Sequence, residues 1–142
     1  MAFNVLIVDD SSSMRAVIKK IIKVSGFNVG CFLEAGDGEE ALKVLEDEWV
    51  DVVLSDINMP NMNGLELVGR MSENEMLRSI PVVMVTTEAS DEKVTKSKQL
   101  GAVGYIKKPF LPEDIKITLS SVMGEEINDE RDNDDEYETG DF

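Results

Sequence analysis

Six polar side chains stand at the ends of short apolar runs, and their types suit chemistry on a phosphoryl group. They are Asp9, Asp10, Asp56, Thr86, Lys107 and Lys108. Three carboxylates brought together repel one another unless a cation joins them, and an all-oxygen site with room for water suits Mg²⁺. A hydroxyl and an ammonium on the other side would complete a place for phosphoryl oxygens. The set indicates phosphoryl chemistry at a carboxylate.

Asp56 is the first candidate for the reacting carboxylate. It closes a short apolar run, residues 52–54, and precedes residues 57–64, which are rich in turn formers. An acid at the C-terminal end of a buried strand lies where open parallel α/β sheets place their ligands. An Asp in this position is at least as often a turn former or a helix cap. The interpretation therefore depends on whether the other strand ends meet Asp56 at one edge.

The elements that would position these residues alternate along the chain. Short apolar runs rich in β-branched residues predict strands at 5–8, 29–33, 52–54, 82–85 and 103–106. Apolar residues at helical spacing, with N-cap and proline signals, predict helices at 14–22, 41–45, 65–71, 90–100 and 112–123. Five such alternations predict a parallel sheet covered by helices on both faces, and they leave the strand order open.

Three local expectations follow from the same patterns. Cys31 falls inside the second predicted strand and is expected to be a buried, inert thiol. Trp49 is expected to pack at the end of the second helix. The segment 90–100 is mainly polar, with Val94 and Leu100 as its clearest anchors, so we expect a weakly held helix.

Composition excludes several classes of protein. A chain of 142 residues with 42% apolar content fits one domain of ordinary size. No apolar run approaches the ~20 residues that span a bilayer, and the N-terminus lacks the features of a signal peptide, so we expect a cytoplasmic protein. With one cysteine and no histidine, the chain can form neither a zinc site of the His or Cys type nor a Ser-His-Asp triad nor a Cys-His pair.

The net charge of −15 disfavours binding to nucleic acid or to an anionic membrane. The charge is uneven, because residues 125–142 carry ten acids against Arg131 alone. We therefore expect a globular domain at 1–124 and a disordered acidic tail at 125–142. The tail is either a solvating segment or one that screens the partner-binding face or engages a basic partner through salt-dependent electrostatics.

Four separated motifs resemble the receiver domain of two-component response regulators, and especially single-domain CheY-like chemotaxis regulators. They are residues 6–10 (LIVDD), 55–64 (SDINMPNMNG), 85–88 (VTTE) and 104–110 (GYIKKPF). The likeness runs from about Asn4 to Met123, in the same order and with similar spacing. It implies a flavodoxin-like (βα)5 three-layer α/β sandwich, whose parallel five-stranded sheet has the order 2-1-3-4-5.

The resemblance also implies a metal site and a phosphoacceptor. Asp56 matches the residue that takes the phosphoryl group from the phosphohistidine of a histidine kinase. Asp10 matches a direct Mg²⁺ ligand, and Asp9 matches an acid that reaches the metal through water. Asn58 matches the residue whose backbone carbonyl coordinates the metal. The implied metal site is thus Asp9, Asp10, Asp56 and Asn58, with Mg²⁺ as the cofactor.

Further positions match the residues that bind the phosphoryl group and respond to it. The phosphoryl-binding and switch group is Thr86, Thr87, Lys108 and Tyr105, in which Thr86 is the switch hydroxyl and Lys108 the paired lysine. The bond from Lys108 to Pro109 is commonly cis in the family, and Lys107 inherits no role. Two positions, Asn58 and Glu88, match those that tune how fast the phosphoryl group is lost.

The function that the resemblance implies is a phosphorylation switch without an effector domain. The partners would be a histidine kinase as phosphodonor and a downstream protein, such as a flagellar motor switch component or a phosphatase, in chemotaxis. We expect a monomer that binds neither nucleic acid nor membrane. It would not be an enzyme in the ordinary sense, because phosphotransfer and autodephosphorylation act on the protein itself.

Three other functions use similar residues. A phosphatase of the haloacid dehalogenase type needs a second Asp two residues after the nucleophile, where this chain has Asn58. A nucleotide-binding or flavin-binding protein needs a loop that binds phosphate through its backbone. Residues 11–13, which are three serines, are only weak evidence for such a loop. A phosphorelay intermediate or phosphate sink would have an identical site and differ only in its partner, so this alternative stays open.

Overall fold

The computed structural model describes residues 2–87 and 90–124, and within them it confirms the predicted alternation. The strands are β1 (Phe3–Val8), β2 (Val29–Ala35), β3 (Val52–Ser55), β4 (Val82–Thr86) and β5 (Gly104–Lys107). The helices are α1 (Ser12–Ser25), α2 (Gly38–Asp47), α3 (Gly64–Ser72), α4 (Asp91–Leu100) and α5 (Pro112–Met123). Glu88 and the acidic tail at 125–142 lie outside the described residues.

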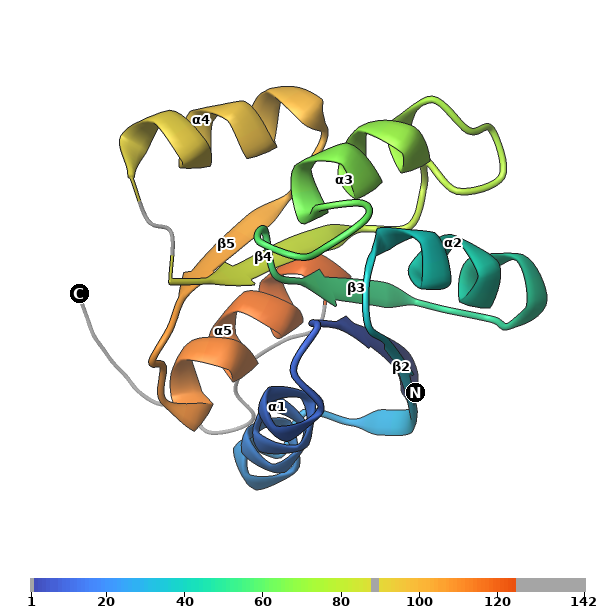
Figure 1. Ribbon diagram of the computed structural model, residues 1–142. Coiled ribbons are helices and arrows are strands. Elements are labelled where there is room, and N and C mark those ends of the chain that lie inside the picture. The colour runs from blue at the N-terminus through green and yellow to red at the C-terminus, as the bar shows by residue number, and fades with distance from the viewer. Residues whose placement is uncertain (1, 88–89, 125–142) are drawn as a thin grey trace.

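The strands form one parallel sheet in the order β2-β1-β3-β4-β5, which confirms the order that the resemblance implied (Figure 1). β1 lies between β2 and β3, and Val8 is aligned with both Ala35 and Ser55. At the far side of the sheet, Thr86 of β4 is aligned with Lys107 of β5. This register brings the carboxyl ends of the strands to one edge, with the residues after β1 and β3 side by side.

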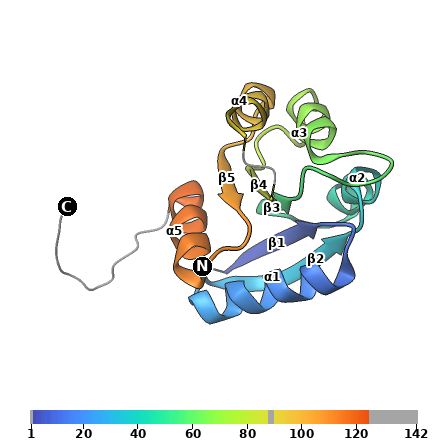
Figure 2. The same cartoon turned by 60° about the vertical axis from the view of Figure 1, so that its left-hand side comes forward.

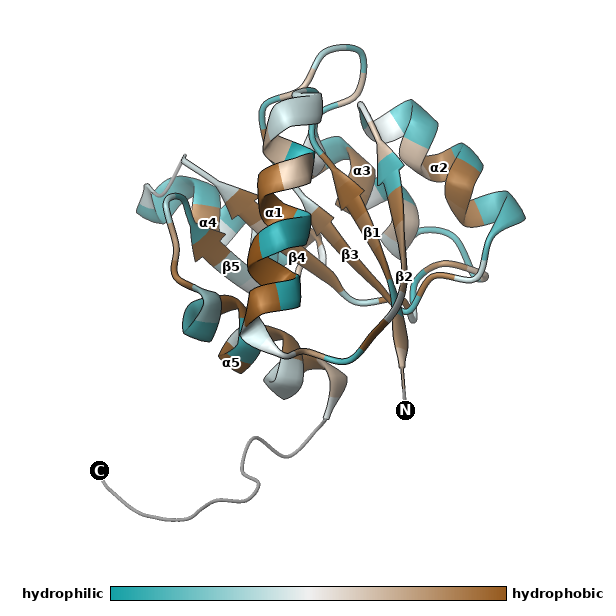
Figure 3. Cartoon of the chain, turned by 90° about the horizontal axis from the view of Figure 1, so that it is seen from below, coloured by the Kyte–Doolittle hydropathy of each residue, from teal (hydrophilic) through white to brown (hydrophobic). Residues whose placement is uncertain are grey.

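The helices cover both faces of the sheet, so the fold has the three layers that were expected. α1 and α5 lie on one face, and α2, α3 and α4 lie on the other (Figure 2). Alternate strand residues serve the two faces, because side chains alternate along a strand: Leu6 and Val8 pack toward α2 and α3, whereas Val5 and Ile7 pack toward α1 and α5. The strands are accordingly apolar along most of their length, as Figure 3 shows.

Four helices begin at residues that cap them. The side chains of Ser11, Asp37, Asn63 and Ser90 each accept a hydrogen bond from a backbone N–H in the first turn of α1, α2, α3 and α4. Each cap follows the strand that precedes its helix, so the caps set the lengths of the loops at the carboxyl edge. No helix within the described ranges is long and apolar enough to cross a membrane.

The expectations for Cys31 and Trp49 were wrong, and the expectation of a weakly held helix at 90–100 was confirmed. Cys31 is exposed because β2 is an edge strand in which only Ala35 is buried. Trp49 is 77% exposed because α2 ends at Asp47 and the following loop carries the indole away from the core. α4 is weakly anchored, since Ser97 is its one buried residue.

The loop between β3 and α3 turns back so closely that Gly64 has no room for a side chain. Its backbone N–H donates to the Ile57 carbonyl oxygen at 2.8 Å. A Cβ atom on Gly64 would lie inside van der Waals contact of the Asp56 carbonyl oxygen and 2.8 Å from Met84 Cε. The backbone around Asp56 therefore depends on glycine at position 64.

Gly64→Ala should lower the free energy of unfolding by about 2 kcal/mol, because the new methyl group would push against the Asp56 carbonyl. Gly69→Ala is the matched control in the same helix, since its Cβ would meet Leu100 at an ordinary 3.6 Å. Better helix propensity should make that variant more stable by about 0.5–1 kcal/mol. Urea unfolding monitored by circular dichroism measures both. Equal stability of the two variants would contradict the close approach.

Candidate functional site

Three carboxylates meet where β1 and β3 end. Asp9 and Asp10 follow β1, and Asp56 follows β3 on the neighbouring strand. One oxygen from each of the three lies within 4.8 Å of the others. Asp9 is buried, Asp56 is half-buried and Asp10 is exposed. The structure thus brings together the three acids that were predicted to form the site, with one side of the cluster open to solvent.

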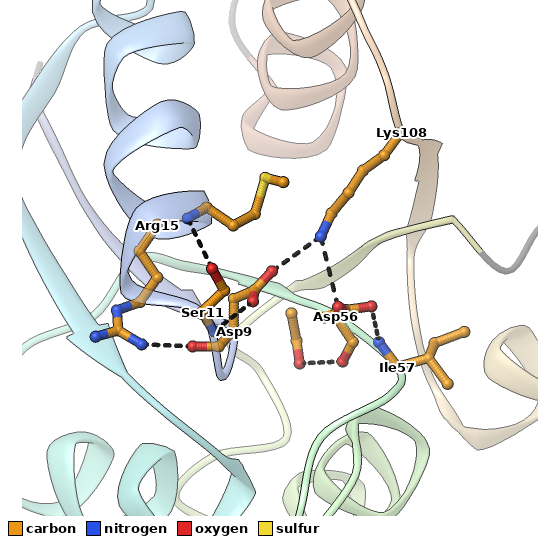
Figure 4. A network of polar contacts seen from close by, with 8 residues as sticks. Asp9, Ser11, Arg15, Asp56, Ile57 and Lys108 are labelled. Atoms are coloured by element: carbon orange, nitrogen blue, oxygen red, sulfur yellow. Dashed lines mark hydrogen bonds and ion pairs between the residues drawn. The ribbon is translucent and has the colours of Figure 1, made fainter.

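The ammonium of Lys108 reaches this cluster from the end of β5. Its Nζ atom lies 2.9 Å from Asp9 Oδ2 and 3.5 Å from Asp56 Oδ2 (Figure 4). The Lys108 backbone N–H donates to the Thr86 carbonyl oxygen at 2.9 Å, and the bond to Pro109 is cis. All three charged side chains are at most 15% exposed. Removing one of these side chains would leave the charges of the other two poorly balanced and largely shielded from water.

Backbone groups fix the orientation of the two carboxylates that face Lys108. Asp56 Oδ1 accepts a hydrogen bond from the Ile57 N–H at 2.7 Å, and Asp9 Oδ1 accepts one from the Ser11 N–H at 2.9 Å (Figure 4). The Arg15 guanidinium also donates to the Asp9 carbonyl oxygen. Each carboxylate therefore has one oxygen tied to the chain and presents the other, Oδ2, to the ammonium.

The donor set fits Mg²⁺. This ion prefers oxygen ligands at 2.0–2.1 Å, so two direct ligands of one ion lie at most about 4.2 Å apart. The 4.8 Å spread of the three carboxylates is slightly wider, which suits a site where some acids bind directly and another through water. Three carboxylates against one ammonium also leave an excess of negative charge for a divalent cation to balance.

The remaining predicted residues lie on β4 and β5, just after β4, and in the loop after β3. Thr86 is fully buried at the end of β4, and Thr87 is exposed just beyond it. Tyr105 is half-buried on β5, and its hydroxyl is buried. Asn58 is exposed in the loop after Asp56. Hydrogen bonds from the Lys108 ammonium join Asp9 and Asp56, and Asp10 lies beside these two carboxylates.

A cluster of charges on α1 and β2 was missed. The Lys19 Nζ atom lies 2.6 Å from Glu34 Oε2. Arg15 Nε lies 2.8 Å from the other Glu34 oxygen. The two cations, Lys19 first, lower the pKa of the Glu34 carboxyl group. The spacing of Arg15, four residues after the cap Ser11, was a signal that it faces the strand end.

A second missed contact ties the loop after Asp56 to α2. Asp37 Oδ2 accepts a hydrogen bond from Asn61 Nδ2 at 2.7 Å, while its other oxygen caps α2 at the Glu40 N–H. Asn61 has a φ of 64°, in the left-handed region that Asn tolerates better than most residues. The Glu40 N–H and then the Asn61 amide lower the pKa of the buried Asp37 carboxyl group. This contact holds the loop that carries Asn58.

Asp37→Asn should lower the free energy of unfolding by about 1 kcal/mol at pH 7 and by less at pH 3. The native pKa of Asp37 lies below its ordinary value of 3.8, so its stabilisation is complete above pH ~4 and is lost as pH falls through the native pKa. Asp47→Asn, at the exposed other end of α2, is the control and should change stability by less than ~0.5 kcal/mol. Urea unfolding between pH 7 and pH 3 measures the difference. A pH-independent gap between wild type and Asp37→Asn would contradict this account.

Comparison with known proteins gives one consistent result. The family model described as "Response regulator receiver domain" matches residues 5–120. Chemotaxis protein CheY-3 of Vibrio cholerae serotype O1 is 40% identical over 120 residues, which are 84% of this chain and 91% of that protein.

Solved structures agree with the sequence comparison. The structure of Vibrio cholerae chemotaxis protein CheY4 has a TM-score of 0.76 at 38% identity, covering 86% of this chain and 99% of that chain. The receiver domain of sensor histidine kinase PA1611 from Pseudomonas aeruginosa PAO1 has a TM-score of 0.76 at 22% identity, covering 87% of this chain and 99% of that chain. That domain, which shares the fold, was solved with a magnesium ion coordinated in its active site cleft.

Proposed function

Because this chain belongs to the family of response regulator receiver domains, we propose that it is a phosphorylation switch. A histidine kinase donates a phosphoryl group to Asp56 in a Mg²⁺-dependent reaction, and the modified domain signals to a partner protein. The observation that carries the proposal is the position of Asp56, half-buried beside two further carboxylates and 3.5 Å from the Lys108 ammonium. The names of its relatives support a role in chemotaxis.

The orientation of Asp56 suggests which oxygen reacts. Oδ1 is held by the Ile57 N–H, whereas Oδ2 faces the ammonium at the open cluster. In the proposed reaction Oδ2 attacks phosphorus, the bond from phosphorus to the kinase histidine breaks, and the histidine leaves with its electron pair. The Lys108 ammonium then pairs with a phosphoryl oxygen and thereby offsets the added negative charge.

The metal site of the proposal consists of Asp9, Asp10, Asp56 and the backbone carbonyl of Asn58. Bound Mg²⁺ would neutralise charge on the transferring phosphoryl group. The magnesium coordinated by the Pseudomonas receiver domain in the corresponding fold supports this choice of ion. The chain's own contribution is to hold the carboxylates in place through the backbone bonds to Asp9 and Asp56.

The response to phosphorylation would begin at Thr86, which ends β4 next to the site. Its hydroxyl would donate to a phosphoryl oxygen, and Thr87 would lie beside it. Tyr105 is aligned with Met84 on the neighbouring strand, so a shift of β4 would reach its ring directly. α4 follows Thr86 in the chain and is weakly anchored, which makes it the element best suited to change position. Asn58 and Glu88 would tune the loss of the phosphoryl group.

Incubation with Mg²⁺ and acetyl phosphate should add a single phosphoryl group to the intact protein, as measured by mass spectrometry. Asp56→Asn should abolish the adduct, because an amide oxygen is a poor nucleophile, and omission of Mg²⁺ should abolish it as well. Asp47→Asn, which removes an exposed acid outside the site, should keep it. An adduct that persists in folded Asp56→Asn, or none in folded wild type, would overturn the proposal.

A further inference from the structure

A groove of about 890 Å³ lies at the edge of the sheet opposite to Asp56. The C-terminal ends of α2 and α3 and the loops that follow them line it. α2 and α3 lie side by side on one face of the sheet, and the loop after α3 extends beyond them (Figure 1). These loops lead into the beginnings of β3 and β4, whereas Asp56 follows the end of β3. The groove is thus separate from the phosphorylation site.

The groove combines a buried apolar floor with an exposed apolar rim. Leu45, Val50 and Leu77 form part of the lining and are each less than 9% exposed. Trp49 and Met76 also line it, and they are 77% and 83% exposed. These are the two most exposed large apolar side chains in the described part of the chain. A partner that covered both side chains would remove their apolar surface from water.

The exposed tryptophan is held in a fixed orientation. Its indole N–H donates to Asp51 Oδ1 at 3.0 Å, and its carbonyl oxygen accepts from Asn4 Nδ2 at 3.0 Å. Asp51 is itself fixed, because its other oxygen accepts from the Asn4 N–H at 2.7 Å. A tryptophan ordered before binding loses little conformational entropy when it is covered. Trp49 therefore has the properties of a preorganised binding anchor.

The charge around the groove is mainly negative. Four acidic residues line it: Glu46, Asp47, Glu48 and Asp51. Arg70 is the one basic residue in the lining, and its guanidinium already pairs with Glu66 at 3.1 Å. A ligand that covers Trp49 and Met76 would be attracted if it carried positive charge beside its apolar side chains.

We propose that this groove docks a basic amphipathic segment of a partner protein. Apolar side chains of the segment would cover Met76 and the floor, and its lysine or arginine side chains would face the acids and the Trp49 ring. A second copy of this chain fits less well, because a two-fold pairing would place the same acidic rims opposite each other. The proposal goes beyond the phosphorylation switch and does not depend on it.

Trp49 provides the measurement, because it is the only tryptophan in the chain. The probe is a synthetic amphipathic peptide of leucine and lysine, and a peptide with glutamate in place of lysine is its control. The lysine peptide should shift Trp49 emission to shorter wavelengths in a saturable manner, since it removes the ring from water. The glutamate peptide should produce no shift.

Variants of the full chain locate the binding surface. Met76→Ala should weaken the lysine peptide roughly fivefold, whereas Val24→Ala, an exposed apolar residue on α1 across the sheet, should not. Glu46→Lys combined with Glu48→Lys should weaken it roughly tenfold. The matched control reverses two exposed acids elsewhere, Glu92→Lys with Glu113→Lys, and should have a smaller effect. All variants should still accept a phosphoryl group at Asp56.

Three results would overturn the proposal. The first is binding without a change in Trp49 emission, where binding is followed by a dye attached to the lysine peptide. That result would place the peptide elsewhere, for example on the acidic residues 125–142. The second is an equal effect of Met76→Ala and Val24→Ala. The third is an emission shift that rises with protein concentration alone and accompanies dimers in sedimentation, which would mean that a second copy covers the groove.

Discussion

The site imposes a charge constraint, because three carboxylates that repel one another at one edge of the sheet need positive charge from elsewhere in the fold. The Lys108 ammonium lies between two of them, with its Nζ atom 2.9 Å from Asp9 Oδ2 and 3.5 Å from Asp56 Oδ2. That ammonium arrives from β5, two strands away from β3, so the charge balance exists only when the whole sheet is assembled in its order. An incoming divalent cation or phosphoryl group would redistribute this balance, which is what makes the edge suitable for a switch.

The two edges of the sheet carry different surface features. At the carboxyl edge, backbone bonds hold the carboxylates of Asp9 and Asp56, and the contact between Asp37 and Asn61 holds the loop after Asp56. The opposite edge carries the acidic groove around Trp49, whose indole N–H donates to Asp51. α4 is the least anchored helix and follows the strand that ends in Thr86. In the proposed switch, motion would therefore occur on the α4 side, away from the groove.

The sequence predicted the alternation of elements and the acids at the strand ends, because apolar runs and the residues that close them are local features. The alternation alone did not predict the exposure of Cys31, because it leaves the strand order open. The order 2-1-3-4-5 that the resemblance implied does place the second strand at the edge, and that signal was not applied to Cys31. The pairs formed by Glu34 with Arg15 and by Asp37 with Asn61 were also missed. Each joins segments that are distant in the chain, and either residue alone reads as an ordinary surface group or cap.

The most direct test of the charge constraint is the dependence of the unfolding free energy on Mg²⁺ in wild type and in Lys108→Met. Without metal the variant should be less stable by about 3 kcal/mol, because two shielded carboxylates lose their counter-charge. Added Mg²⁺ should stabilise the variant more than the wild type, since the ion then replaces the positive charge that Lys108 supplied to the carboxylates of Asp9 and Asp56. Equal stabilisation of both proteins by Mg²⁺ would contradict the account.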